Sequence, residues 1–283
     1  MKPTQIILLV IVLTFSQCFH DEFKVNPAKG DQPIITVKYL NTQIKNHSTN
    51  VTGTITLLEN PLLHTTFYPS PSGCPGSAPV SVSSDFYHCS LAQNAGFFNM
   101  ETLACLGPLV SDGKIIQNPS TIQSSFGITK YGNYSIGYID QSTINDNVFQ
   151  NLINARIWLI RAGKSFVDES EKIEKISQNF LNERAPRTAI GFNKKGQLLL
   201  GAVNGLESAN EGLNLYEFAD LMIENGFYYA SNLDGGGSLT TYYKDKILNT
   251  CSDHCGSTNK DYPCPSPQGT CERLAKHDYQ NKN

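Results

Sequence analysis

The chain is organised around the stretch Ser231-Asn232-Leu233-Asp234-Gly235-Gly236-Gly237-Ser238-Leu239-Thr240-Thr241-Tyr242-Tyr243. One strand-like run leads into it and a second leads out. Consecutive glycines are costly to order, because glycine loses more backbone entropy on folding than any other residue. A chain keeps them where φ must be positive or where a ligand lies against the backbone. A hairpin turn of the Asp-Gly type would need one glycine rather than three, so we favour a binding loop over a plain hairpin.

The residues immediately before this stretch predict a helix. Asn214 serves as the cap, and Glu217 three residues later completes the pattern of a capping box. Gly226 ends the helix in a conformation that glycine adopts readily. Apolar residues recur at helical spacing and form one buried face: Leu215, Phe218, Ala219, Met222 and Ile223. Glu217 is therefore assigned a structural role in preference to a catalytic one.

A further candidate segment is Arg184-Ala185-Pro186-Arg187-Thr188. Proline has no N–H to donate within a sheet, so Pro186 marks the beginning of a strand. Arg187 and Thr188 consequently lie at a strand end, where functional groups often occur. The alternative is an exposed arginine at the edge of a sheet.

Short strands separated by turns account for much of the remaining sequence. Segments 33–40 and 52–58 are rich in β-forming residues, and further strands are expected between residues 109 and 203. The unbroken apolar run 157–160 predicts a central strand. The charged run 169–175 predicts a solvated loop or a short helix. Turns are expected at Asp112-Gly113, Ala162-Gly163 and Lys195-Gly196.

These patterns predict an α+β fold, namely one β-rich domain of mixed sheets with a few flanking helices, stapled by disulfides. At 283 residues the chain is long enough to bury a sizeable core. No internal repeat or linker divides it convincingly. We expect the domain to extend from about residue 23 to residue 274, followed by a polar tail at 275–283.

Residues 1–18 predict a secretory signal peptide. Lys2 precedes the apolar run 6–15, and Ser16-Gln17-Cys18 supplies small residues for cleavage. The run is too short to span a bilayer, and no later run has spanning length. We therefore expect no membrane span and a protein that enters the secretory pathway.

Glycosylation acceptors and cysteines agree with that destination. Asn46, Asn50 and Asn133 each begin an Asn-X-Ser/Thr acceptor for N-glycosylation. Eight cysteines in an oxidising compartment predict disulfides, and seven remain if cleavage follows Cys18. A zinc cluster is the alternative, but no pair of cysteines near the C-terminus has C-x2-C spacing.

The charge pattern argues against a nucleic-acid partner. Charged residues make up 17% of the chain, the net charge is -3, and no basic run occurs. Neutralising the phosphates of a nucleic acid needs clustered lysine and arginine.

Several familiar catalytic motifs are absent from the sequence. It contains no G-x-S-x-G, P-loop, H-E-x-x-H or G-x-G-x-x-G pattern, and its six histidines form no short-spaced ligand pair. A metal site would need Asp and Asn residues from distant segments. Asp253-His254 beside Cys255 is assigned to a disulfide-tethered loop in preference to catalysis.

The remaining candidates combine a carboxylate, a guanidinium and backbone amides. They are Asp234 with its glycines, Arg187 with Thr188, and the bend 94–99. This set suits a negatively charged phosphate ester, and it equally suits sugar hydroxyls held by Asn and Asp. The candidate binding residues are Asn94, Gly96, Asn99, Asn232, Gly235, Gly236, Gly237 and Ser238.

In these segments the chain resembles the phosphodiester glycosidase family. The match is specific, because many short segments agree in order between about residues 74 and 271. Two departures are Ala95, where relatives often have glycine, and Asn204, where the animal enzymes have an acidic residue. The matching segments are 93–98, 105–107, 110–112, 158–161, 187–191, 195–198, 212–215, 232–238 and 252–255.

The resemblance implies an enzyme that hydrolyses GlcNAc-α-1-phospho-6-mannose on N-glycans of lysosomal enzymes, releasing GlcNAc and exposing mannose 6-phosphate. It implies no metal or other cofactor, and phosphorylated high-mannose glycoproteins as partners. The animal enzymes add EGF-like repeats, a membrane span and a cytoplasmic tail, which match nothing in this chain. We expect the lumen of the Golgi or lysosome, or secretion, and the sequence indicates no oligomeric state.

The same resemblance suggests roles at the site. Asp234 is expected to stabilise or attack the anomeric carbon, and Arg187 with Thr188 to hold the phosphate. The leaving phosphate is a weak base, so one prominent carboxylate suffices. Two rival hypotheses are a metal-assisted phosphodiesterase that cleaves the P–O bond and a non-catalytic glycan-binding module.

The family pattern, with the short loop of the last pair, also implies three disulfides: Cys74–Cys105, Cys89–Cys271 and Cys255–Cys264. Cys251 is then the odd thiol, or it pairs with Cys18 if cleavage falls earlier.

Overall fold

The computed structural model describes residues 19–25, 34–45, 47, 50–59, 61–252 and 265–273. Some of the expectations concern residues outside these ranges and stay predictions. They are the signal peptide at 1–18, the tail at 275–283, the acceptor Asn46, the pair Cys255–Cys264 and the neighbouring Asp253-His254.

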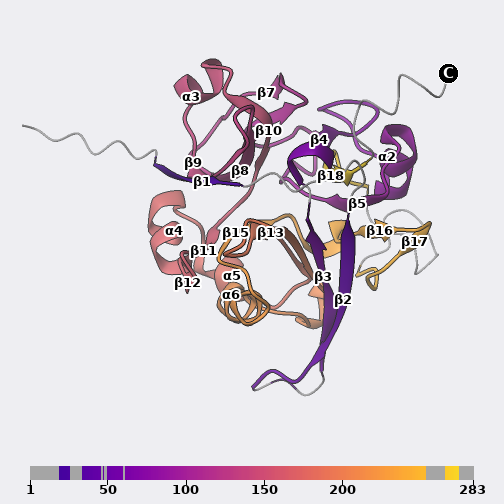
Figure 1. Ribbon diagram of the computed structural model, residues 1–283. Coiled ribbons are helices and arrows are strands. Elements are labelled where there is room, and N and C mark those ends of the chain that lie inside the picture. The colour runs from indigo at the N-terminus through magenta and orange to yellow at the C-terminus, as the bar shows by residue number, and fades with distance from the viewer. Residues whose placement is uncertain are drawn as a thin grey trace, which may run out of the picture.

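The described strands form three sheets (Figure 1). The first sheet has the order β1 (His20–Lys24), β9 (Asn133–Tyr138), β8 (Ser124–Thr129), β10 (Phe149–Asn154), β6 (Leu109–Ser111) and β7 (Lys114–Gln117). The second has the order β12 (Lys164–Ser165), β11 (Trp158–Arg161), β15 (Tyr229–Leu233), β13 (Arg187–Phe192), β14 (Leu198–Val203), β3 (Val51–Leu58) and β2 (Ile35–Thr42). The third has the order β17 (Lys246–Ile247), β16 (Thr241–Tyr243), β5 (Leu91–Asn94), β18 (Gln268–Glu272) and β4 (Thr65–Pro69).

Every pairing among these strands is antiparallel, whereas mixed sheets were expected. Tight turns are part of the reason. Asp112 and Gly113 have φ of 48° and 77° between β6 and β7, and Ala162 and Gly163 have φ of 51° and 76° between β11 and β12. Two-residue turns with positive φ join antiparallel neighbours. Both turns and the β-rich α+β class are confirmed.

The helices flank the sheets: α1 (Pro61–His64), α2 (Val80–Tyr87), α3 (Gln141–Asn145), α4 (Val167–Glu174), α5 (Gln178–Asn182) and α6 (Leu215–Glu224). Helix α6 begins with the predicted capping box, because the Asn214 side chain accepts the Glu217 N–H at 2.9 Å and Glu217 accepts the Asn214 N–H at 3.2 Å. Gly226 follows the helix with φ of 93°, as predicted. For the charged run 169–175 a solvated loop or a short helix was expected. The run forms most of helix α4.

The second sheet lies between the first sheet and a helical layer that includes α6 (Figure 1). Alternate side chains of β13 serve the two interfaces, as the period of a strand requires. Ile190 and Phe192 belong to the core that contains Phe126 of the first sheet. Ala189 belongs to the core that contains Phe218 of α6. This packing fixes the central strands on which the site is built.

Two of the predicted disulfides lie within the described residues, and both are confirmed. Cys74 and Cys105 have Cα atoms 5.6 Å apart, and Cys89 and Cys271 have Cα atoms 5.4 Å apart. The second bond joins residues 182 positions apart, so it ties β18 to the chain just after α2. Joining residues so distant in sequence strongly restricts the unfolded chain.

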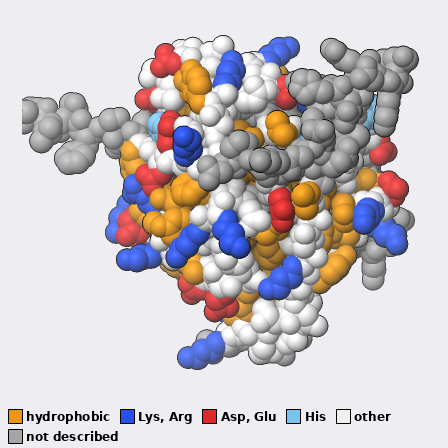
Figure 2. Space-filling view, viewed as in Figure 1, with side chains coloured by type: hydrophobic (Ala, Val, Ile, Leu, Met, Phe, Trp, Pro, Cys, Tyr) orange, Lys and Arg blue, Asp and Glu red, His pale blue; other side chains and the backbone are white. Residues whose placement is uncertain are grey.

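Acidic and basic side chains are interspersed over the face seen in Figure 2, which carries no extended basic surface. Asn50 is exposed and Asn133 is half-buried at the start of β9. Within the part of the chain that the structure describes, no helix has the length and apolar character needed to cross a membrane.

Candidate active site

The glycine loop lies where the second and third sheets meet. Asp234 comes directly after β15, and the chain continues through a short 3-10 helix, η2 (Gly236–Ser238), into β16. Both ends of the loop are bonded to β5 and the residue after it. The Asp234 N–H donates to the Ala95 carbonyl at 2.8 Å, and the Asn94 N–H donates to the Thr240 carbonyl at 3.0 Å. The loop is therefore held by two sheets.

Asn94 and Thr188 hold the main chain of Asp234. The Asn94 Nδ2 and the Thr188 Oγ1 both donate to the Asp234 carbonyl oxygen, each at 2.6 Å. The Asn94 Oδ1 also accepts the Thr240 N–H at 3.0 Å. Both side chains are buried. These contacts make them positioning groups for the loop, where a direct hold on substrate or phosphate was expected.

Close approach requires glycine at two positions of the loop. A Cβ at Gly235 would lie 2.2 Å from the Pro186 carbonyl oxygen. Gly236 has φ of +53°, and a Cβ there would lie 2.5 Å from the Glu207 Oε1. The Gly236 N–H donates to the same Pro186 carbonyl at 3.0 Å. A plain hairpin turn would not bring two other segments this close, so the loop is more than a turn.

The loop forms one wall of a cavity of about 420 Å³. The structure brings several predicted residues together there: Asp234, Arg187, Gly235, Gly236, Gly237 and Ser238. Two more lining residues, Phe97 and Phe98, belong to the predicted bend 94–99, whereas no sequence pattern indicated the others: Ser77, Met100, Leu103, Phe180, Glu183, Glu207 and Pro265. The cavity is thus lined by both charged and apolar groups.

Glu207 provides a second carboxylate beside Asp234. It begins a short 3-10 helix, η1 (Glu207–Ala209), in the connection between β14 and α6. Its carboxylate lies against the α-carbon of Gly236. One prominent carboxylate was expected, and the cavity has three, because Glu183 also lines it. No motif marks Glu207 in the sequence, because only the folded chain brings residue 207 next to residues 234–236.

The environment of Asp234 raises the pKa of its carboxyl group. Burial is the main reason that the pKa of Asp234 rises from 3.8 to about 7; the charge of Glu207 adds to the rise, and hydrogen bonds from Ser238 and the Gly235 backbone oppose it. The Oδ2 of Asp234 is buried and has no hydrogen-bond partner among the described residues. An acid whose pKa lies near neutrality is able both to donate and to accept a proton at physiological pH.

Arg187 is a buried cation of the cavity. It begins β13 in the interior of the second sheet and is 3% exposed, so the alternative of an exposed edge arginine is wrong. Its Nε donates to the Leu213 carbonyl at 3.1 Å, and its Nη2 donates to the Phe180 and Glu183 carbonyls at 3.1 and 2.8 Å. Burial lowers the pKa of Arg187, whereas Glu183 and Glu207 raise it. Its Nη2 also lies 3.9 Å from the Glu183 Oε1, so a carboxylate already accompanies this buried cation.

Aromatic rings form part of the cavity lining. The rings of Phe97 and Phe180 meet edge to face with centroids 6.2 Å apart. The Arg187 guanidinium lies 5.1 Å from the Phe180 centroid, and that of Arg156 lies 6.0 Å from the Phe97 centroid. Rigid aromatic surface of this kind suits the apolar face of a small ring.

Like Asn94, three other predicted binding residues lie outside the lining of the cavity. A Cβ at Gly96 would lie 2.2 Å from the Gln268 Nε2, so this glycine serves close packing. The Asn99 Oδ1 accepts two N–H groups of its own turn, each at 2.9 Å. The Asn232 Nδ2 donates to the Arg156 carbonyl at 3.1 Å. All three residues therefore support the structure around the cavity and do not line it.

Metal-binding side chains are scattered in the described part of the chain. No three His, Cys, Asp or Glu residues there are grouped closely enough to hold a metal ion. The carboxylates that share the cavity, Glu183, Glu207 and Asp234, do not form such a group either.

Sequence comparison relates the chain to named proteins. A model of the family described as phosphodiester glycosidase matches residues 87–263, which is more than half of the chain. The N-acetylglucosamine-1-phosphodiester alpha-N-acetylglucosaminidase of Mus musculus is 37% identical over 177 residues, covering 59% of this chain and 34% of that protein. The chain spans about a third of the length of the curated relatives that it matches.

Structural comparison agrees with the sequence match. The catalytic domain of the zebrafish N-acetylglucosamine-1-phosphodiester alpha-N-acetylglucosaminidase, auto-inhibited by its pro-peptide, superposes with a TM-score of 0.83 at 30% identity, covering 90% of this chain and 88% of that one. A hypothetical protein from Synechocystis shares the fold, with a TM-score of 0.62 at 16% identity, over 84% of this chain and 61% of that one. This chain belongs to the phosphodiester glycosidase family.

Proposed function

We propose that this protein hydrolyses GlcNAc-α-1-phospho-6-mannose on N-glycans of lysosomal enzymes, releasing GlcNAc and exposing mannose 6-phosphate. The observation that carries the proposal is one cavity that holds Asp234, Glu207 and Arg187, in a family whose matched relatives are named for this activity. Each of these groups has a task in such a reaction.

The charged groups of the cavity match the charges of the substrate and of the transition state. A GlcNAc-phosphate ester carries a negative phosphodiester, and cleavage at the anomeric carbon develops positive charge on the sugar. The buried guanidinium of Arg187 suits the phosphate, because a desolvated cation attracts an anion more strongly than an exposed one. Carboxylates on the same cavity wall suit the developing oxocarbenium ion.

The carboxyl groups of the cavity suit the proton transfer that the reaction needs. The attack of water on the sugar requires a group that removes a proton, and departure of the phosphate needs little acid help. The pKa of Asp234, raised to about 7, lets this carboxyl exchange protons near neutral pH. Glu207 then supplies a second carboxylate against the glycine loop. We assign the electrostatic and proton-transfer roles to this pair.

The size and lining of the cavity suit a sugar phosphate. A cavity of about 420 Å³ accommodates one sugar with its phosphate. Gly235 to Gly237 also line the cavity, where their backbone is able to approach a ligand without side chains in between. Phe97 and Phe180 add aromatic surface, which suits the apolar face of GlcNAc and its acetyl methyl group.

Partners and location follow from the same proposal. The macromolecular substrates are phosphorylated high-mannose glycoproteins, and the compartment is the Golgi or lysosomal lumen or the extracellular space. The two confirmed disulfides support an oxidising compartment.

The deciding experiment is an assay of the purified protein on GlcNAc-α-phosphomannoside. We expect GlcNAc and mannose 6-phosphate as products, undiminished by a chelator. Glu207→Gln and Asp234→Asn should each reduce kcat by at least about 10²–10³, because each removes one well-placed charge. Loss of turnover with a chelator would indicate a metal-assisted phosphodiesterase. Binding of the ester without any turnover would indicate a glycan-binding module.

A further inference from the structure

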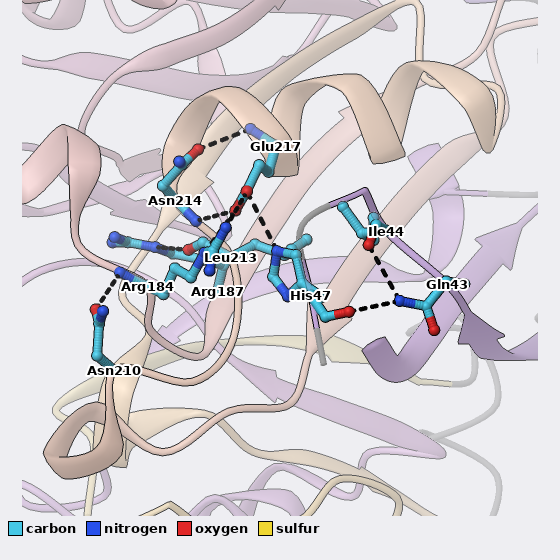
Figure 3. A network of polar contacts seen from close by, with 9 residues as sticks. All are labelled: Gln43, Ile44, His47, Arg184, Arg187, Asn210, Leu213, Asn214 and Glu217. Carbon is cyan, nitrogen blue, oxygen red and sulfur yellow. Dashed lines mark hydrogen bonds and ion pairs between the residues drawn. The ribbon is translucent and has the colours of Figure 1, made fainter. Parts of the chain in front are cut away.

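Three separate segments of the chain contact the Glu217 carboxylate (Figure 3). Arg184 donates to it through Nη2 at 2.7 Å and through Nε at 3.3 Å. The Asn214 N–H donates to it at 3.2 Å, and the Nε2 of His47, at the tip of the β2–β3 hairpin, lies 3.2 Å away. The Glu217 side chain is only 19% exposed, so these partners largely replace water.

This environment keeps Glu217 ionised. Burial by itself raises the pKa of a carboxyl group. At Glu217 the hydrogen bonds from Arg184, Asn214 and His47 outweigh burial, and the pKa lies below its usual value. Helix capping alone needs only the Asn214 contact. The contacts to Arg184 and His47 therefore need another explanation.

One chain of contacts leads from Glu217 to Arg187. Leu213 directly precedes Asn214, the N-cap of α6, whose N–H donates to the Glu217 carboxylate. Leu213 and Ala185 exchange two backbone hydrogen bonds, at 3.3 and 3.1 Å. The Leu213 carbonyl also accepts the Nε of Arg187 at 3.1 Å. The orientation of the cavity guanidinium consequently depends on where the first turn of α6 is held.

A second chain of contacts leads from Glu217 to Glu207. The side chain of Arg184 is held by Glu217, and its backbone N–H donates to the Asn210 Oδ1 at 3.0 Å. Asn210 directly follows η1 with φ of 52°, and its own N–H donates to the Glu207 carbonyl at 2.9 Å. The connection that carries the second carboxylate is thus anchored to the same acid.

We propose that Glu217 is a positioning residue for the candidate active site. It lies outside the cavity and sets the relative placement of Arg187 and Glu207, with Arg184 and His47 as its clamps. The inference rests on the proposed function, in which these two charged groups act on one substrate. A mispositioning of about 1 Å suffices to lower a rate about 10²-fold.

The test compares Glu217→Gln with Glu224→Gln, an exposed acid at the other end of α6. Turnover of GlcNAc-α-phosphomannoside is measured at a temperature where circular dichroism shows both variants fully folded. We expect Glu217→Gln to lower kcat at least tenfold and Glu224→Gln to leave it unchanged. Full activity of folded Glu217→Gln would overturn the proposal.

A double-mutant cycle separates positioning from stability. Arg187→Lys removes the fork through which Glu217 acts on the substrate. If Glu217 acts through Arg187, the double variant should lose less than the product of the two single losses, although the two side chains share no direct bond. If the loss in kcat of the double variant equals the product of the two single losses, Glu217 does not act through Arg187.

A readout independent of activity keeps the inference apart from the proposed function. The buried Nε–H of Arg187, bonded to the Leu213 carbonyl, should give a protected arginine signal in ¹H–¹⁵N NMR spectra, assigned by its absence in Arg187→Lys. Glu217→Gln should shift this signal or speed its exchange with solvent, and Glu224→Gln should not. An unchanged signal would overturn the inference even for an active enzyme. An inactive wild-type protein with a shifted signal would overturn the proposed function alone.

Discussion

Replacing Gly236 with alanine tests the pairing of the glycine loop with Glu207. At this position φ is +53°, and an added Cβ would lie 2.5 Å from the Glu207 Oε1 and 2.9 Å from its Cδ. The substitution adds one methyl group and no charge. It therefore moves Glu207 without altering the chemistry of either carboxylate.

Two magnitudes follow from these distances. Moving the carboxylate from 2.5 Å to an ordinary contact of 3.4 Å displaces it by about 0.9 Å. A displacement of about 1 Å lowers a rate roughly 10²-fold when the displaced group is catalytic. Alanine in the left-handed region separately destabilises the fold by about 1–2 kcal/mol. The loss of activity should therefore be much larger than the loss of stability would explain.

Gly226→Ala is the matched control. Gly226 also has positive φ, at +93°, but a Cβ there meets nothing within 4 Å. Steady-state kinetics and urea unfolding of both variants should show similar destabilisation, with kcat reduced about 10²-fold only in Gly236→Ala. Equal kcat in the two folded variants would refute the assignment of Glu207 to the active site.

Two further substitutions and one disulfide mapping have defined outcomes. Arg187→Ala should abolish most turnover and lower the free energy of unfolding by at least about 1–3 kcal/mol, because buried carbonyl groups lose their donor; wild-type stability in urea would contradict this. Burial raises the pKa of Glu272 from 4.5 to about 8, so the folded protein binds more protons than the unfolded chain between these values and loses stability as the pH rises through them. The melting temperature of Glu272→Gln should hence fall less than that of wild type from about pH 5 to pH 8, and parallel curves would contradict this. Non-reducing peptide mapping should find Cys255 joined to Cys264, and a Cys251–Cys264 peptide would exclude that pairing.

Local sequence patterns predicted the elements whose cause is local. The capping box of Asn214 and Glu217 depends on residues three apart, so the sequence contains all of its determinants. The turn at Asp112-Gly113 likewise follows from the residues that tolerate positive φ. Asp234 and Arg187 were recognisable because an unusual glycine run and a strand-initiating proline lie next to them in sequence.

The contacts between distant segments were not predictable in this way. Glu207 reaches Gly236 because its connection and the glycine loop converge at one end of the second sheet, and no spacing in the sequence records that convergence. Asn94 and Thr188 stood out as polar residues in short motifs, but their hydrogen bonds to the Asp234 carbonyl depend on strand register. The residue types at positions 94 and 188 showed that the side chains are polar. They did not show which atom these side chains would bond.

In the proposed reaction, the bond that breaks lies between the anomeric carbon of GlcNAc and the oxygen that links it to phosphorus. Hydrolysis of GlcNAc-α-phosphomannoside in ¹⁸O-labelled water tests it most directly. Free GlcNAc exchanges its anomeric oxygen with water, so the informative product is mannose 6-phosphate, analysed by mass spectrometry. We predict that its phosphate carries no label, because water attacks carbon. Label in the phosphate would mean cleavage of the P–O bond and would contradict the glycosidase mechanism.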